Sequence, residues 1–127
     1  MKKINKNKFK SWKDYYFNYQ YELAKQFYIP LLKKREIPLK DQKIIDIGCG
    51  NGGFISAFYK HSNNLYGIEI KEFDWPSEIK GKIIFLIGDL TEMTSYKRAI
   101  IGQAADLIIL RDVIEHIPIN KKLFFLQ

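Results

Sequence analysis

The chain has 127 residues and a formal net charge of +7 at pH 7, with 28% of its residues charged. This length fits one domain of ordinary size, and the single cysteine excludes an intrachain disulfide and suits a reducing compartment. The sequence contains no apolar run as long as a membrane span, and its first residues lack the apolar stretch of a signal peptide. We therefore expect a cytoplasmic protein.

An amphipathic helix is predicted at the start of the chain. Apolar and aromatic residues recur there at helical spacing, and Pro30 is expected to close the pattern; they are Trp12, Tyr15, Tyr16, Tyr19, Leu23 and Phe27. Such a stripe is typical of a helix that packs against the rest of its protein. We therefore divide the chain into a basic, aromatic-rich helical segment, residues 1–40, and a main domain, residues 41–127.

The whole net charge lies in the N-terminal segment. Residues 1–40 contain 11 basic and 3 acidic side chains, whereas residues 41–127 contain 10 and 11. A basic arm of this kind can bind nucleic acid or an anionic membrane surface. However, the chain has 18 Lys and only 3 Arg, and Arg is the residue that best contacts phosphates and bases. The composition therefore argues against nucleic-acid binding and favours lysine as a solubilising residue.

Residues 44–53 predict a buried strand that runs into a glycine-rich turn. Apart from Asp46, the run Ile44–Ile47 has no polar alternation, as expected of a parallel strand covered on both faces. Glycines allow the backbone to turn sharply and to approach a ligand closely. A helix is predicted to start at Phe54, so the N–H groups of the turn would point toward the ligand. The pattern indicates a nucleotide-type site.

The glycine spacing fits two patterns, and Asp46 helps to choose between ligands. Gly48, Gly50 and Gly53 fit G-x-G-x-x-G, whereas Gly48, Gly50 and Gly52 fit G-x-G-x-G. A carboxylate near the strand end would repel the pyrophosphate of NAD or FAD and favour a cationic ligand. S-adenosylmethionine carries a sulfonium and an ammonium group and no phosphate. It is therefore the predicted cofactor, and an NAD-dependent oxidoreductase is the disfavoured alternative.

Acidic residues also end the next two predicted strands. Residues 64–70 predict the second strand, with Glu69 at its end, 21 positions after the first glycine of the turn. One carboxylate there can accept hydrogen bonds from both hydroxyls of a ribose. Residues 82–90 predict the third strand, where Asp89 is expected to accept from an adenine amino group while the Leu90 N–H meets a ring nitrogen.

A fourth strand is predicted over residues 106–110, and Arg111 and His116 follow it. His116 is the candidate general base if a reacting group must lose a proton; alternatively, it is a histidine of the pocket wall. Cys49 is interpreted as a small residue tolerated in a tight loop. His61 and His116 have no partner at metal-ligand spacing, so no metal is predicted.

The chain from residue 43 to 118 resembles the cofactor-binding half of class I S-adenosylmethionine-dependent methyltransferases. The first motif of that family matches Asp46, Gly48, Gly50 and Gly52; Glu69 matches its ribose acid, Asp89-Leu90 its adenine motif, and residues 106–116 the motif after the fourth strand. Residues 113–117 are similar to branches that methylate small molecules such as quinone precursors, lipids and sugars.

The resemblance implies a small-molecule methyl acceptor, S-adenosylhomocysteine as the product, and an N-terminal helix that can serve as a lid over the cofactor. The expected cofactor-binding residues are Asp46, Gly48, Cys49, Gly50, Gly52, Glu69, Asp89, Leu90 and Arg111. His116 is the expected catalytic residue. A catalytically inactive cofactor-binding or scaffold protein is the alternative to an active enzyme.

The expected fold is α/β: a Rossmann-like, mostly parallel sheet with helices on both faces, preceded by the aromatic-rich helix. The family sheet is seven-stranded, and the sequence predicts a sheet truncated after its fourth strand. A strand left at the edge would expose unpaired backbone groups. We therefore expect a fragment of a longer protein, or a homodimer or partner chain that covers this edge, and no methyl transfer by these residues alone.

Overall fold

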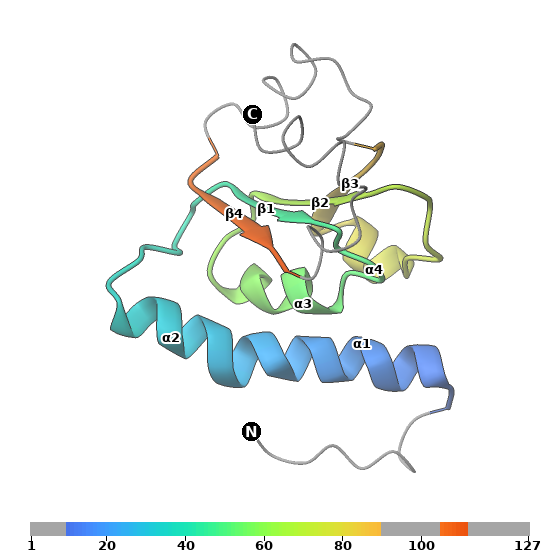
Figure 1. Cartoon of the computed structure of the whole chain (residues 1–127), viewed down its shortest axis with the longest axis horizontal. Coiled ribbons are helices and arrows are strands. Elements are labelled where there is room, and N and C mark those ends of the chain that lie inside the picture. Colours follow the sequence, from blue (N-terminus) through green and yellow to red (C-terminus); the bar gives the residue numbers. More distant parts are fainter. Residues whose placement is uncertain (1–9, 90–104, 112–127) are drawn as a thin grey trace, which may run out of the picture.

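The computed structural model describes residues 10–89 and 105–111 (Figure 1). The sheet has four parallel strands in the order β3-β2-β1-β4. The strands are β1 (Ile44–Ile47), β2 (Leu65–Glu69), β3 (Ile83–Ile87) and β4 (Leu107–Leu110). The helical elements are α1 (Trp12–Leu23), the π-helix η2 (Ala24–Tyr28), α2 (Ile29–Lys34), α3 (Gly53–Ser56), the 3-10 helix η3 (Ala57–Lys60) and α4 (Ser77–Lys80). This arrangement confirms the predicted parallel, Rossmann-like α/β fold.

The core lies between the sheet and the helices that cover one of its faces. Figure 1 shows α1, α2 and α3 on the same side of the sheet. The register aligns Ile44 of β1 with Leu65 of β2 and with Leu107 of β4. Ile44 and Leu65 pack in this core with Phe54 and Phe58, which come from α3 and η3. The short helix α4 was not predicted from the sequence.

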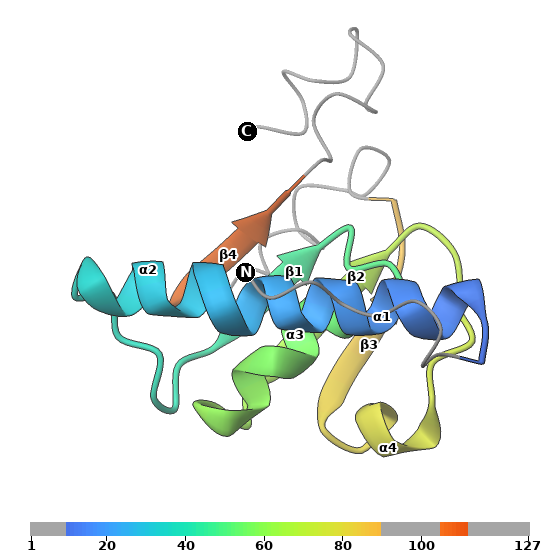
Figure 2. The same cartoon turned by 90° about the horizontal axis from the view of Figure 1, so that it is seen from below.

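The N-terminal helix continues past Pro30 and ends at Lys34, so the prediction that Pro30 closes it is wrong. A proline inside an α-helix removes one hydrogen bond and its ring clashes with the carbonyl four residues earlier. The π-helix η2, which has wider turns than an α-helix, ends two residues before Pro30. At its end the Ile29 N–H donates to the carbonyl of Ala24, five residues earlier. The helix therefore accommodates the proline, and Figure 2 shows one continuous rod.

The N-terminal helix packs closely against α3. A Cβ atom on Gly53 would collide with the backbone carbonyl oxygen of Phe17, so only a glycine allows this approach. Further along, the rings of Tyr28 and Phe54 meet edge to face with their centroids 5.2 Å apart. Part of the aromatic stripe is left outside the core, since Trp12 is 68% exposed. Within the described residues, no helix is long and apolar enough to cross a membrane.

Candidate functional site

The glycine turn after β1 has a backbone that L side chains rarely adopt. Gly48, Gly50 and Gly52 have φ angles of 71°, 56° and 85°, all in the left-handed region that favours glycine. A Cβ atom on Gly52 would also lie 3.0 Å from Cζ of Phe85, whereas a Cβ atom on Gly50 would meet nothing within 4 Å. These three glycines form the turn, in agreement with the G-x-G-x-G pattern. Open space lies over Gly50, where a ligand can approach the backbone.

Glu69 at the end of β2 ties that strand to the glycine turn. Its Oε2 atom accepts a hydrogen bond from the Gly50 N–H at 2.8 Å, and its Oε1 atom accepts from the Ile70 N–H at 3.0 Å. A carboxylate offers about four acceptor positions, so Glu69 can still accept from ligand hydroxyls. The Gly88 N–H donates to the Glu69 carbonyl at 2.8 Å, which brings Asp89 to the same edge of the sheet.

Asp46 on β1 is buried below the turn, with 2% of its surface exposed. Burial raises its pKa to about 7; the nearby positive charge of Arg111 opposes this shift, and Glu69 adds to it. Its Oδ2 atom has no hydrogen-bond partner. Asp46 is therefore only partly ionised near neutral pH. A cationic ligand close to Asp46 would favour its charged form.

Arg111 directly follows β4 and joins three elements. Its guanidinium lies 3.5 Å from the ring centroid of Phe54, and its Nη2 atom donates to Oε1 of Gln20 in α1 at 3.0 Å. Its Nε atom is buried without a partner. Buried polar groups are normally hydrogen-bonded, and exceptions call for an unseen partner such as a ligand or a water. A carboxylate oxygen of Asp46 and a guanidinium nitrogen of Arg111 are thus both buried without a hydrogen-bond partner, near the ends of the adjacent strands β1 and β4.

Cys49 faces the core of the protein. Its side chain is 7% exposed, and a Cβ atom on Gly67 would come within 2.8 Å of its sulfur atom. Burial, and then the nearby carboxyls of Asp46 and Glu69, raise the pKa of the thiol above its ordinary value. This environment agrees with a small packing residue rather than a nucleophile. Any contact between Cys49 and a cofactor would involve its backbone.

Trp75, in the loop between β2 and α4, is a site residue that the sequence analysis missed. Its indole Nε1 atom donates to the Gly50 carbonyl at 2.9 Å. The indole stacks on Phe85, with ring centroids 4.2 Å apart and planes 10° from parallel. Trp75 therefore supports the glycine turn from the side of β2. The sequence offers only a weak signal for this role, an aromatic residue six positions after Glu69.

A cavity of about 400 Å³ opens beside the turn, between α1 and the loop after β2. Asn51 of the turn lines it, together with Lys13, Asp14, Phe17 and Asn18 of α1. The N-terminal helix therefore forms one wall of a space that borders the glycine turn.

Two predicted site residues, Leu90 and His116, lie outside the described residues. Asp106 lies at the amino-terminal end of β4, where its Oδ2 atom accepts from the Lys43 N–H at 2.8 Å. This acid is thus remote from the glycine turn. Within residues 10–89 and 105–111, no group of three His, Cys, Asp or Glu side chains is placed to hold a metal ion.

The model of the methyltransferase domain family matches residues 16–124, and the chain therefore belongs to that family. This match includes the glycine turn, Glu69 and Arg111, and it confirms the resemblance found in the sequence. Among solved structures, the chain is similar to Streptomyces venezuelae DesVI, with 14% identity and a TM-score of 0.49. The similarity covers 74% of this chain and 40% of DesVI, so the chain spans about two fifths of that protein's length. A search of curated proteins gives no significant match.

Proposed function

We propose that this domain binds S-adenosylmethionine over the glycine turn and serves the transfer of its methyl group to a small-molecule acceptor. The observation that carries the proposal is the link between Glu69 and Gly50, at 2.8 Å, beside open space over Gly50. The Glu69 carboxylate thus lies next to a backbone that a ligand can approach, and this position supports its assignment as the group that would bind the ribose. The methyltransferase family match over residues 16–124 supports the same assignment.

The residues present fit the polar groups of this cofactor. Glu69 would accept from the ribose hydroxyls, and Asp89 with Leu90 would hold the adenine. The turn residues Gly48, Cys49, Gly50 and Gly52 would contact the cofactor through their backbone. The unpaired Nε atom of Arg111 suits the carboxylate of the amino-acid part, and the unpaired Oδ2 atom of Asp46 suits its positive charges.

When bound, S-adenosylmethionine supplies an electrophilic methyl group on a sulfonium. The domain's own contribution would be to orient the acceptor in line with this group and to exclude water. The N-terminal segment, residues 1–40, would act as a lid, because α1 walls the cavity beside the turn. We assign the remaining residues, 41–127, as the cofactor-binding domain.

His116 is proposed as the general base for an acceptor that must lose a proton. In the complete enzyme, His116→Ala is expected to lower turnover about 10²–10⁴-fold while cofactor affinity stays unchanged. Steady-state kinetics and cofactor titration measure the two quantities separately. Unchanged turnover would instead assign His116 to the pocket wall.

We further propose that the protein works in the cytoplasm. We also propose that a second copy or a partner chain covers the exposed edge of the sheet at β4. Within the described sheet β4 pairs with β1 alone, and Ile108 of β4 is 52% exposed. Light scattering on the purified chain is expected to show a dimer or larger species. A stable monomer that transfers methyl groups would contradict this part of the proposal.

Titration calorimetry with S-adenosylhomocysteine and, separately, with NAD tests the proposed cofactor. We expect S-adenosylhomocysteine to bind and NAD to give no heat of binding. Equal or tighter binding of NAD would replace the methyltransferase proposal with an oxidoreductase. If neither ligand binds, the domain is a scaffold that has lost its cofactor.

A further inference from the structure

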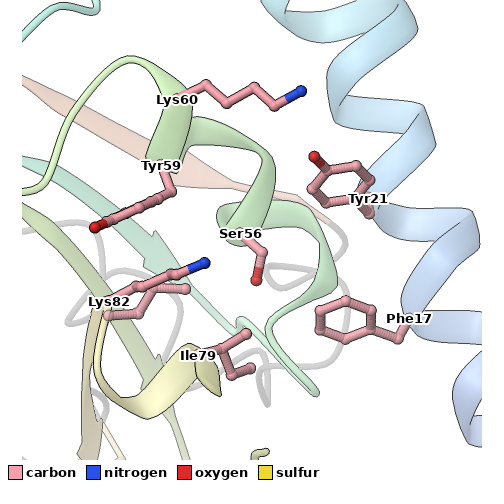
Figure 3. A pocket seen from close by; sticks show the side chains of 8 residues that line it. Phe17, Tyr21, Ser56, Tyr59, Lys60, Ile79 and Lys82 are labelled. Carbon is pink, nitrogen blue, oxygen red and sulfur yellow. The ribbon is translucent and has the colours of Figure 1, made fainter.

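A second cavity lies on the helix-covered side of the sheet, near the amino-terminal end of β3. It has a volume of about 200 Å³ and is lined by Phe17, Tyr21, Ser56, Tyr59, Lys60, Ile79, Lys82 and Ile83 (Figure 3). None of the candidate cofactor-binding residues belongs to this lining. Phe17 and Ile79 also line the larger cavity beside the glycine turn, so the two cavities are neighbours that share these two side chains.

The inner part of the cavity is apolar. Ile79 and Ile83 are buried, with 9% and 2% of their surface exposed, and the ring of Phe17, which belongs to α1, lies across from Ile79 (Figure 3). These side chains come from α1, α4 and β3, three elements that the core holds together. A flat apolar group could enter between them and bury its surface without a rearrangement of the fold.

The mouth of the cavity is positively charged. Lys60 and Lys82 line it, and the lining contains no Asp or Glu. Neither ammonium group has a carboxylate partner among the described residues. The Lys82 Nζ atom lies 4.8 Å from the ring centroid of Tyr59, a contact that helps to hold the ammonium in place.

Two further observations describe the positive charge around this cavity. Figure 3 shows the Lys82 ammonium beside Ser56 and the Lys60 side chain extended toward α1. Partial burial, and then the positive charges of Lys33 and Lys60, lower the pKa of the neighbouring His61. The field at the mouth thus disfavours cations and favours an anion.

We propose that this cavity is a second ligand site and that it binds a small aromatic carboxylate. The aromatic ring lies between Phe17 and Ile79, the carboxylate receives a hydrogen bond from Lys82, and Lys60 adds a second positive charge at the mouth. A phosphate alone would leave the apolar inner walls unused, and an uncharged ring would leave the two ammonium groups unpaired. The combination of both features in one cavity selects an anion with an apolar body.

Titration of the isotopically labelled full chain with benzoate tests this site, with benzamide and inorganic phosphate as reference ligands. Amide chemical shifts of Ser56, Tyr59 and Lys82 are expected to move with benzoate at the lowest concentration of the three ligands. Equal responses to benzamide would show that charge plays no part. Equal responses to phosphate would show a simple anion contact at the surface.

The double variant Lys60→Gln/Lys82→Gln is expected to weaken benzoate binding about tenfold, because the charge-assisted hydrogen bond from Lys82 and the nearby positive charge of Lys60 are lost. The matched control is Lys40→Gln/Lys80→Gln, which removes two exposed lysines that do not line the cavity. The control is expected to bind benzoate like the unmodified chain. Equal weakening in both variants, or none in either, would overturn the proposal.

Discussion

The ends of β1 and β2 carry one acidic residue each, and the two acids occupy opposite environments. Asp46 is buried, and its pKa is raised to about 7, mainly because water is excluded. Glu69 is half-buried, and its carboxylate accepts two backbone hydrogen bonds. Burial thus disfavours the charged form of Asp46 on β1, whereas the carboxylate of Glu69 on β2 is hydrogen-bonded to the glycine turn.

In the proposed cofactor site, the two acids would therefore contribute in different ways. Glu69 would be in position before the ligand arrives, because its carboxylate is held by the N–H groups of Gly50 and Ile70. Asp46 becomes favourable only when a positive charge lies nearby. The substitutions below test each half of this comparison, from the largest expected effect to the smallest.

Asp46→Asn is expected to remove a large pH dependence of stability. A carboxyl whose pKa rises on folding stabilises the native state fully below its unfolded pKa, near 3.8, and that stability is lost as the pH rises to about 7. The free energy of unfolding of the variant, relative to the unmodified chain, should therefore increase by about 4 kcal/mol across this range. Urea denaturation at a series of pH values measures the difference.

The control for this experiment is Asp74→Asn, since Asp74 is exposed. Its stability should follow that of the unmodified chain at every pH. If the stability of Asp46→Asn also followed that of the unmodified chain at every pH, the raised pKa assigned to Asp46 would be incorrect.

Glu69→Ala is expected to weaken the binding of S-adenosylhomocysteine by about 1.5–3 kcal/mol, the range for hydrogen bonds to a charged group. Titration calorimetry measures this change. Glu72→Ala is the matched control, because Glu72 is exposed in the loop that follows β2. Unchanged affinity in Glu69→Ala would mean that the acid on β2 only supports the turn.

Gly53→Ala tests how the N-terminal helix holds the far side of the turn. The new methyl group would collide with the backbone oxygen of Phe17, and overpacking of this kind costs about 1–3 kcal/mol of stability. Gly81→Ala is the control, since the nearest atom to its Cβ would be 3.8 Å away. Denaturant unfolding should separate the two variants, and equal stability would disprove the close approach of α1.

Trp75→Phe removes the hydrogen bond from the loop after β2 to the Gly50 carbonyl and preserves an aromatic ring. We expect a loss of about 1 kcal/mol in unfolding free energy, the net value of one such bond. Trp12→Phe serves as the control because Trp12 is 68% exposed. A loss of the same size in both variants would show that the bond at Gly50 contributes nothing measurable.

Much of the fold could be predicted because the strands follow simple patterns. The apolar runs before Asp46 and Glu69 and over residues 107–110 gave the strands, and the glycine spacing located the turn. The sequence could not show that the helix would continue past Pro30 by way of the π-helix η2, because a π-helix depends on the packing of neighbouring turns. Gly53, the fourth glycine of residues 48–53, allows the close approach of Phe17. The sequence could not predict this contact, because the two residues are far apart along the chain and meet only in the folded protein.

The site was predictable in its residue types and less so in its electrostatics. The position of Glu69 after the glycine turn was enough to place it beside that turn. The protonation of Asp46 depends on burial and on Arg111, which is 65 positions away in the sequence. Trp75 reaches Gly50 through a side-chain hydrogen bond that no spacing rule describes.

A crystal structure of the chain with S-adenosylhomocysteine is the most direct test of the central claim, that the glycine turn and Glu69 form the cofactor site. We predict that both ribose hydroxyls lie within hydrogen-bonding distance of the Glu69 carboxylate and that the ligand passes over Gly50. A nucleoside bound elsewhere, with Glu69 contacting only the backbone N–H groups of Gly50 and Ile70, would contradict this account.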